Sequence, residues 1–158
     1  MTRRNIVLAI LALGAASIAA IAVVRAQSIA DLPAEMFPYT DQAVIAEGQG
    51  LYDAHCAACH GADLEGQDNW RSPGADGKLP APPHDETGHT WHHPDAQLFM
   101  ITKYGTEALV GGNYRSNMIG FDDILTDDEI IAVLAYIKST WPADIQARHT
   151  AMNRARGG

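Results

Sequence analysis

The 158-residue chain is short of cysteine and of basic residues, and each shortage excludes a class of protein. Its two cysteines, Cys56 and Cys59, are too few for a disulfide framework. Lys and Arg total 11 against 19 Asp and Glu, a net charge of −8, which disfavours a nucleic-acid-binding protein. No strand-like alternation, internal repeat, P-loop, dinucleotide fingerprint or Ser-His-Asp pattern stands out. The sequence therefore predicts an all-α protein without those enzyme signatures.

The N-terminus has the pattern of an export segment. Residues 6–24 are uncharged and mostly aliphatic, and they follow Arg3 and Arg4. A short positive stretch before an apolar run is typical of a signal peptide, but this run is also long enough to span a bilayer. Residues 1–26 are thus predicted to be either a cleaved signal peptide or a retained membrane anchor. Both interpretations place the remainder in the bacterial periplasm, because the arginines stay in the cytoplasm.

The exported part is predicted to contain one helical domain between a linker and a tail. Residues 27–40 show no period and are read as a linker, whereas 41–141 show helical spacing of apolar residues. Residues 142–158 are read as a tail with a short helix. The exported part contains all 19 acidic residues but only 8 basic ones.

Three helices are expected within the domain. The first runs from Asp41, as N-cap, into Cys56. The second begins at Pro94 as its first residue and ends at Gly105. The third begins with the capping box Thr126–Glu129 and ends before Pro142. Residues 61–93 are rich in glycine and proline and are predicted to be mostly loop.

The sequence Cys56-Ala-Ala-Cys59-His60 has the C-x-x-C-H spacing of covalent haem attachment. Two thiols three residues apart at a helix end can reach two vinyl groups of one porphyrin, and the following histidine is then held against the iron. A thioredoxin-like pair would need a βαβ setting, and a zinc site would need further spaced ligands. A structural disulfide across so short a span would be strained. The motif therefore predicts one covalent haem c with His60 as an iron ligand.

With these residues the chain resembles the class I monohaem cytochromes c, over about residues 41–141. The likeness also includes a methionine before the last helix and the sequence Leu134-Ala-Tyr-Ile137. The resemblance implies a small cytochrome c fold around one haem, in which the first and last helices cross closely. Gly48 and Tyr52 match the crossing positions of the first helix, and Val133 and Tyr136 match those of the last.

The resemblance also implies the second iron ligand. Family members place a methionine in the loop before the last helix, commonly as Met-Pro-x-Phe, and Met118 occupies that place with Ile119 instead of the proline. Met100, between apolar residues of the second helix, is expected to pack in the core. A proline carbonyl accepts the other ring N–H of the proximal histidine in such cytochromes, and Pro82 and Pro83 are both candidates.

A group of histidines is the rival source of ligands. Imidazoles bind Fe, Cu and Zn, so this group could supply a bis-His haem or a second metal site. The favoured interpretation is that they lie beside the haem edge and bond to backbone, propionates or water. Trp91 and Tyr114 are expected to be walls of the haem pocket. The histidines of this group are His84, His89, His92 and His93.

These features favour a periplasmic single-electron carrier. A haem subunit of a membrane-associated dehydrogenase or oxidase complex, and a metal-handling module using the histidine loop, are the alternatives. Asp122 and Asp123 lie between Met118 and the last helix, beyond the acids that the helix cap uses. A redox partner with a basic patch is therefore expected. The sequence does not indicate an oligomeric state.

Overall fold

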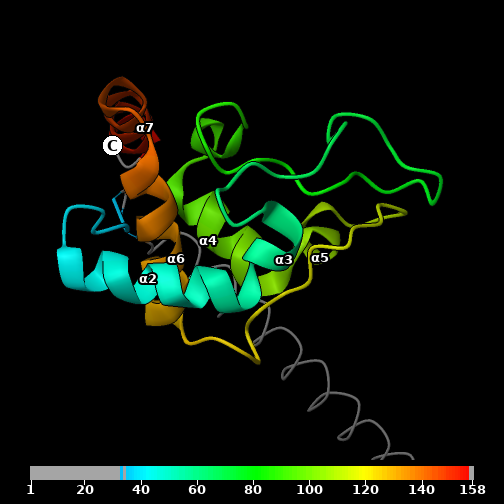
Figure 1. Ribbon diagram of the computed structural model, residues 1–158, viewed down its shortest axis with the longest axis horizontal. Helices are drawn as coiled ribbons and strands as arrows, with labels where there is room; N and C mark the ends of the chain where they lie inside the picture. Colours follow the sequence, from blue (N-terminus) through cyan, green and yellow to red (C-terminus); the bar gives the residue numbers. More distant parts are fainter. Residues whose placement is uncertain (1–32, 34, 157–158) are drawn as a thin grey trace, which may run out of the picture. The chain divides into compact units, whose positions relative to one another are not determined.

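The computed structural model describes residues 33 and 35–156. The chain divides into two units, 1–32 and 33–158, and only the second is described. The predicted signal or anchor at 1–26 lies outside the described residues. The second unit contains a 3-10 helix, η1 (Thr90–His92), and no strand in its described part, which confirms the all-α fold class (Figure 1). Its α-helices are α2 (Gln42–His55), α3 (Ala57–His60), α4 (Asp95–Tyr104), α5 (Thr106–Val110), α6 (Asp127–Thr140) and α7 (Ala143–Arg156).

The helix starts follow local hydrogen bonding. The Asp41 carboxylate accepts the N–H groups of Ala43 and Val44, and Thr126 and Glu129 form the reciprocal capping box of α6. Both arrangements satisfy N–H groups that the first helical turn leaves unpaired. Pro94 is the N-cap of α4 rather than its first residue, so the helix begins one residue later than the sequence predicted. It has extended backbone angles there, so the helix begins at Asp95.

α2 and α6 cross to form the most extensive helix–helix contact (Figure 1). A Cβ atom on Gly48 would lie 2.0 Å from the carbonyl oxygen of Ala132 and 3.0 Å from the Cβ of Tyr136. The Tyr52 and Tyr136 rings pack at 5.5 Å between centroids. The crossing thus uses Gly48, Tyr52 and Tyr136 as expected, while the backbone atom nearest Gly48 belongs to Ala132 rather than to Val133.

The N-terminal segment and α7 are packed parts of the domain. Residues 33 and 35–40 differ from the expected linker, because Phe37 is buried and the Met36 N–H donates to Asp95 at 2.7 Å. From α7, His149 and Asn153 are buried against the region around Asp95. The tail thus forms a helix, α7, from Ala143 to Arg156. This helix also contacts the N-terminal segment, because Arg154 pairs with Glu35 at 2.5 Å.

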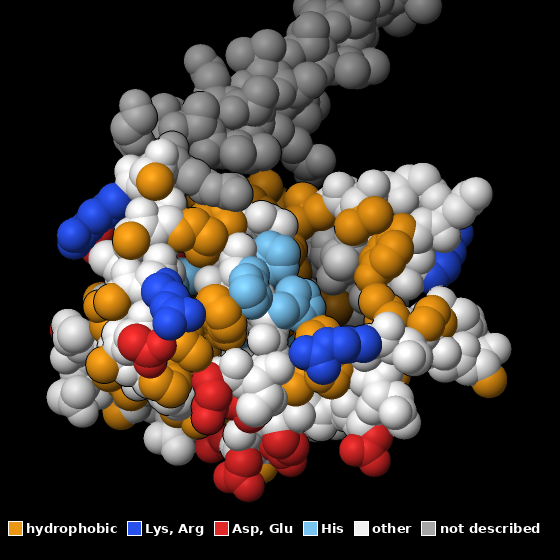
Figure 2. Space-filling model, turned by 90° about the horizontal axis from the view of Figure 1, so that it is seen from above, with side chains coloured by type: hydrophobic (Ala, Val, Ile, Leu, Met, Phe, Trp, Pro, Cys, Tyr) orange, Lys and Arg blue, Asp and Glu red, His pale blue; other side chains and the backbone are white. Residues whose placement is uncertain are grey.

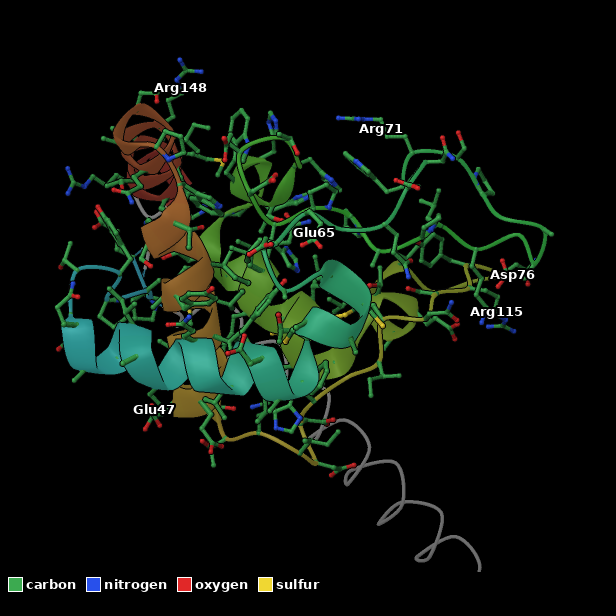
Figure 3. All side chains as sticks on the ribbon, viewed as in Figure 1. Glu47, Glu65, Arg71, Asp76, Arg115 and Arg148 are labelled. Carbon is green, nitrogen blue, oxygen red and sulfur yellow. The ribbon has the colours of Figure 1, made fainter. Side chains whose placement is uncertain are left out.

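The long loop between α3 and η1 has a neck at Gln67 and Ala81, where hydrogen bonds join its two sides, and its outer part contacts another loop. The Gln67 N–H donates to the Ala81 carbonyl at 2.8 Å, and the Ala81 N–H donates back to the Gln67 side chain at 2.9 Å. Beyond this neck the loop extends away from the helices (Figure 1), and Lys78 donates to Asn117 at 2.6 Å. Figure 3 shows Asp76 and Arg115 at this end of the domain, far from Arg148 on α7.

Within the described residues, no helix combines the length and the apolar character needed to cross a bilayer.

Candidate haem site

The two cysteines lie on one turn at the end of the first helical segment. Cys56 forms the junction between α2 and α3, and Cys59 is in α3 immediately before His60. Both are free thiols; Cys56 is half-buried and Cys59 is exposed. Burial, together with the nearby Cys59, raises the pKa of Cys56 to about 11, so its thiol is protonated at neutral pH. The turn presents two unpaired thiols beside one imidazole.

His60 has one ring nitrogen bonded to the protein and the other left for a ligand. Its Nδ1 lies 2.8 Å from the carbonyl oxygen of Pro82. Because that oxygen only accepts, Nδ1 carries the proton and Nε2 keeps its lone pair. Of the two candidate prolines, the structure thus selects Pro82. Burial lowers the pKa of His60, which favours the neutral imidazole that binds a metal.

The turn after His60 is anchored to the helix crossing. The Tyr52 hydroxyl donates to the Gly61 carbonyl at 2.9 Å, and Tyr52 has no exposed surface. Burial is the main cause that raises the pKa of Tyr52, so its hydroxyl remains a donor at physiological pH. The contact between α2 and α6 is thereby connected through one side chain to the backbone next to the proximal histidine.

His84 lies against His60. The two ring centroids are 4.0 Å apart with an angle of 26° between the planes, a stacked arrangement. Two imidazoles that bind one iron from opposite faces would lie end to end across the metal, so His84 in this position is not the second ligand of a bis-His haem. Burial is the main cause that lowers the pKa of His84 well below its ordinary value, with His60 and His89 adding to the effect.

Met118 is half-buried in a loop that the short helix α5 holds in place. The Met118 N–H donates to the Ser116 hydroxyl at 3.0 Å, and the Ser116 N–H donates to the Glu107 carboxylate at 2.8 Å. On the other side the loop meets α4, because Cβ atoms on Gly105 and Gly120 would lie 2.7 Å from backbone atoms of the opposite segment. The main chain around Met118 is fixed by these contacts.

The other predicted pocket residues have different surroundings. Trp91 is in η1, where its indole N–H donates to the Glu86 carbonyl at 3.3 Å and its ring stacks on His92 at 3.7 Å. Its polar tip therefore already has a backbone partner. Tyr114 is half-buried, and its backbone N–H donates to Gly111 at 3.3 Å. In the part of the chain that the structure describes, neither side chain hydrogen-bonds to His60 or Met118 or stacks on the His60 ring.

Histidine side chains gather at the centre of one face of the domain (Figure 2). In the histidine group, the His89 ring stacks on Trp70 with 5.1 Å between centroids and packs edge-on against His93 at 5.3 Å. In residues 33 and 35–156, no group of three or more His, Cys, Asp or Glu side chains is placed to hold a metal ion. The geometry therefore does not support a second metal site in the histidine loop.

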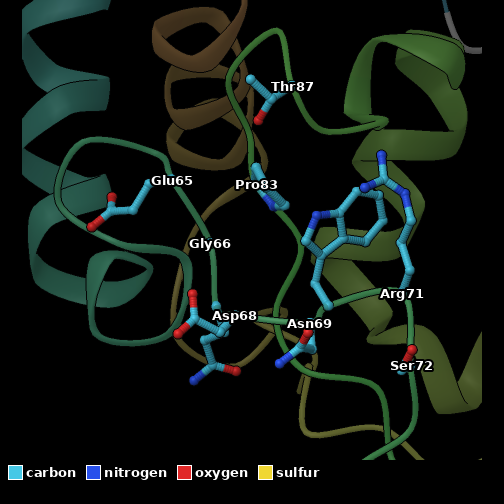
Figure 4. Close-up of a pocket in the computed structure, with 10 residues that line it drawn as sticks. Glu65, Gly66, Asp68, Asn69, Arg71, Ser72, Pro83 and Thr87 are labelled. Atoms are coloured by element: carbon cyan, nitrogen blue, oxygen red, sulfur yellow. The ribbon is translucent and has the colours of Figure 1, made fainter.

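A pocket of about 580 Å³ lies against the long loop between α3 and η1 (Figure 4). It is lined by residues on both sides of the loop neck, including Glu65, Arg71 and Pro83. Trp70 also lines it, but Arg71 covers one side of the indole at 3.9 Å and His89 stacks on the ring. The indole is thus already in contact with two side chains of the protein.

Several residues outside the motif support the site, and their sequence pattern does not predict this role. Thr90, Glu107, Ser116 and Trp141 bond to the segments that carry His84 and Met118. Three of these are polar residues in loops or short helices, where no periodicity marks a role. Trp141 ends the apolar stripe of α6, and only the structure shows its indole N–H donating to the His84 carbonyl.

The donor set can be tested against a covalent haem. Two free thiols on one turn and a neighbouring histidine with a single free nitrogen are the groups that such a haem requires, and a methionine thioether is of the kind that can fill a further axial position. The residues present fit the group.

Comparison with known proteins gives the same family as the motif. The family model described as "Cytochrome c" matches residues 45–141. A nitrite reductase of Stutzerimonas stutzeri is 34% identical over 96 residues, which cover 57% of this chain. The match spans only 15% of that longer protein. No solved structure matches significantly.

Proposed function

Because this chain belongs to the cytochrome c family, we propose more specifically what kind of haem-dependent electron-transfer protein it is. It is a single-electron carrier of the bacterial periplasm with one haem c. The haem would supply an iron that alternates between the ferrous and ferric states. Cys56 and Cys59 would hold it through thioethers, and His60 and Met118 would be its axial ligands.

The observation that carries this proposal is the hydrogen bond between His60 and Pro82. It fixes the imidazole tautomer and leaves Nε2 as the coordinating atom, next to two free thiols. A backbone acceptor for the other ring nitrogen is the usual support of a metal-bound histidine, and it makes the ligand more basic. A single short segment therefore provides attachment and proximal ligation.

Met118 is the favoured sixth ligand because of the contacts that surround it. Its loop is fixed by α5 and by close packing against α4, whereas His84 is stacked on His60 and is not available on the opposite face. A thioether ligand raises the reduction potential relative to a second imidazole. A filled sixth position also suits a protein that transfers electrons without binding a substrate at the iron.

The second candidate is the haem subunit of a larger redox enzyme, such as a membrane-associated dehydrogenase or oxidase complex. The observation in its favour is the similarity to a short part of a nitrite reductase. A subunit would co-purify with its enzyme from solubilised membranes, whereas a free carrier would elute alone from the periplasmic fraction.

The test of the carrier proposal compares two methionines. In the wild type, the ferric protein should show the near-infrared Met–iron band, and the ferrous protein should not bind carbon monoxide readily. Met118→Ala should lose the band and bind carbon monoxide. Met100→Ala, at a half-buried position of α4, should keep the band and mainly reduce stability, by less than the about 2–5 kcal/mol typical of a fully buried methionine. A band that survives Met118→Ala would reject the ligand assignment.

A further inference from the structure

His84 belongs to the short segment that also provides the hydrogen bond to His60. Pro82 accepts the His60 Nδ1–H through its carbonyl oxygen, and two residues later the His84 ring stacks on the His60 ring, with 4.0 Å between centroids and 26° between planes. The segment thus contacts the imidazole at its edge and on its face. A hydrogen bond in the ring plane restrains one atom, but it leaves the ring able to tilt about that bond.

His84 is itself fixed at three polar atoms by three parts of the fold. Its backbone N–H donates to Leu64 at 2.8 Å, its carbonyl oxygen accepts the Trp141 indole N–H at 2.7 Å, and its Nδ1 lies 2.8 Å from the Thr90 hydroxyl. Thr90 and Trp141 are both buried. These bonds hold the ring as well as the backbone, so His84 is a rigid neighbour for His60.

We propose that His84 is a positioning residue that sets the plane of the His60 imidazole and shields its hydrogen bond to Pro82 from water. The proposal rests on the proposed function only in that His60 binds the haem iron. Axial histidines depend on their surroundings for orientation, because the terminal ring torsion is broad by itself. A flat ring at stacking distance narrows that torsion, which a branched aliphatic side chain of similar size would not do as well.

The experiment uses the full-length haem-loaded protein and four variants. His84→Phe keeps a flat ring and His84→Leu removes it. Thr90→Val removes the hydroxyl that bonds to the His84 ring but keeps a side chain of the same shape as threonine. His92→Leu is the matched control, because His92 is exposed and belongs to the same histidine group. NMR of the ferrous protein measures the exchange of the His60 Nδ1–H with solvent. NMR of the ferric protein measures the hyperfine shifts of the haem methyl groups, which report the plane of the axial imidazole.

In His84→Leu, the His60 Nδ1–H should exchange roughly two- to tenfold faster, the range expected for losing one stacked aromatic pair. The pattern of haem methyl shifts should change as well. Thr90→Val and His84→Phe both keep a flat ring but lose its hydrogen bond to the Thr90 hydroxyl, so each should change both readouts in the same direction but by less than His84→Leu does. His92→Leu should remain close to the wild type. If His84→Leu does not fold, the comparison of Thr90→Val and His84→Phe with His92→Leu carries the test.

Two results would overturn the proposal. The first is an unchanged exchange rate and methyl pattern in both His84→Leu and Thr90→Val. The second is a His84→Phe protein that differs from the wild type as much as His84→Leu does, since the flat ring would then be irrelevant. Failure of His60 ligation is recognised separately, because the wild-type ferric protein would then lack hyperfine-shifted signals from the His60 ring.

Discussion

A Cβ atom placed on Gly48 would lie 2.0 Å from the carbonyl oxygen of Ala132, so the closest approach of α2 and α6 has no room for a side chain. Gly48→Ala must therefore separate the helices or bend one of them. Overpacking of this kind typically costs about 1–3 kcal/mol. Because Tyr52 connects this crossing to the turn after His60, the change should also weaken the haem site.

Gly50 provides the matched control for that prediction. It lies in the same helix, is exposed, and would have no atom within 4 Å of an added Cβ. Gly50→Ala should raise the free energy of unfolding by about 0.5–1 kcal/mol, since alanine favours helix. Urea unfolding of both variants measures the difference, and equal effects at the two positions would contradict the close crossing.

The main helices were predictable from the sequence because their signals are local. The Asp41 cap, the Thr126–Glu129 capping box and the apolar stripe of α6 each lie within one element. The C-x-x-C-H motif is local as well. The helix α5 was missed because it has five residues between Gly105 and Gly111, too few to show a period.

Contacts between distant segments could not be read in this way. Asp95 and Asn153 are polar residues on helices, a pattern that usually indicates an exposed face, yet they are 58 positions apart and bond to each other in the interior. The choice of Pro82 over Pro83 likewise depends on how the long loop turns back toward α3. The position of His84 on His60 required the same three-dimensional information.

Covalent attachment should require both thiols. In Cys56→Ala or Cys59→Ala, one thioether is lost, and haem that remains on the protein in a denaturing gel should be sharply reduced. Haem staining of the gel measures this directly. Full staining of the Cys59→Ala protein would show that a single thiol suffices and would contradict the two-thioether assignment. Met152→Ala, in α7, is a control that should keep normal staining.

Stability should fall in mild acid because of His149. The pKa of this side chain is lowered mainly by burial and also by the charge of Lys138. The hydrogen bond to the His93 carbonyl and the charge of Asp95 act in the opposite direction, but the net pKa stays lowered. The folded state therefore binds its proton at lower pH than the unfolded state. The stability that neutral His149 provides is complete above the ordinary histidine pKa of about 6.5 and is lost as pH falls below it.

The variant that checks this is His149→Gln, whose amide can still donate to the His93 carbonyl, the acceptor that lies 2.8 Å from His149 Nε2. The free energy of unfolding at pH 7.5 and at pH 5.5 is compared for both proteins. The wild type should lose more stability than His149→Gln, by at most about 1.4 kcal/mol per pH unit for one proton. Other groups, such as His84, contribute equally to both proteins and cancel. Parallel pH profiles would show that His149 does not titrate on unfolding.

Partner binding should depend on the acidic segment between Met118 and α6. Lys103 neutralises Asp127 at 2.5 Å, and Glu129 serves the helix cap, but among the described residues no ion pair includes the exposed Asp122 or Asp123. Such charges attract a partner with a basic patch at a rate that falls as salt screens them over a Debye length of roughly 8–10 Å. Replacing both with Asn should slow electron transfer to that partner and flatten its salt dependence.

A second double variant separates this local effect from net charge. Asp53→Asn with Asp144→Asn removes the same two charges from exposed positions on α2 and α7. It should change the rate and its salt dependence less than the Asp122 and Asp123 replacement does, because neither carboxylate belongs to the acidic segment between Met118 and α6. Stopped-flow measurement across ionic strengths compares the three proteins, whose haem spectra should be identical. If both double variants slow the reaction equally, only the total charge matters; if neither does, docking is apolar or depends on a membrane tether.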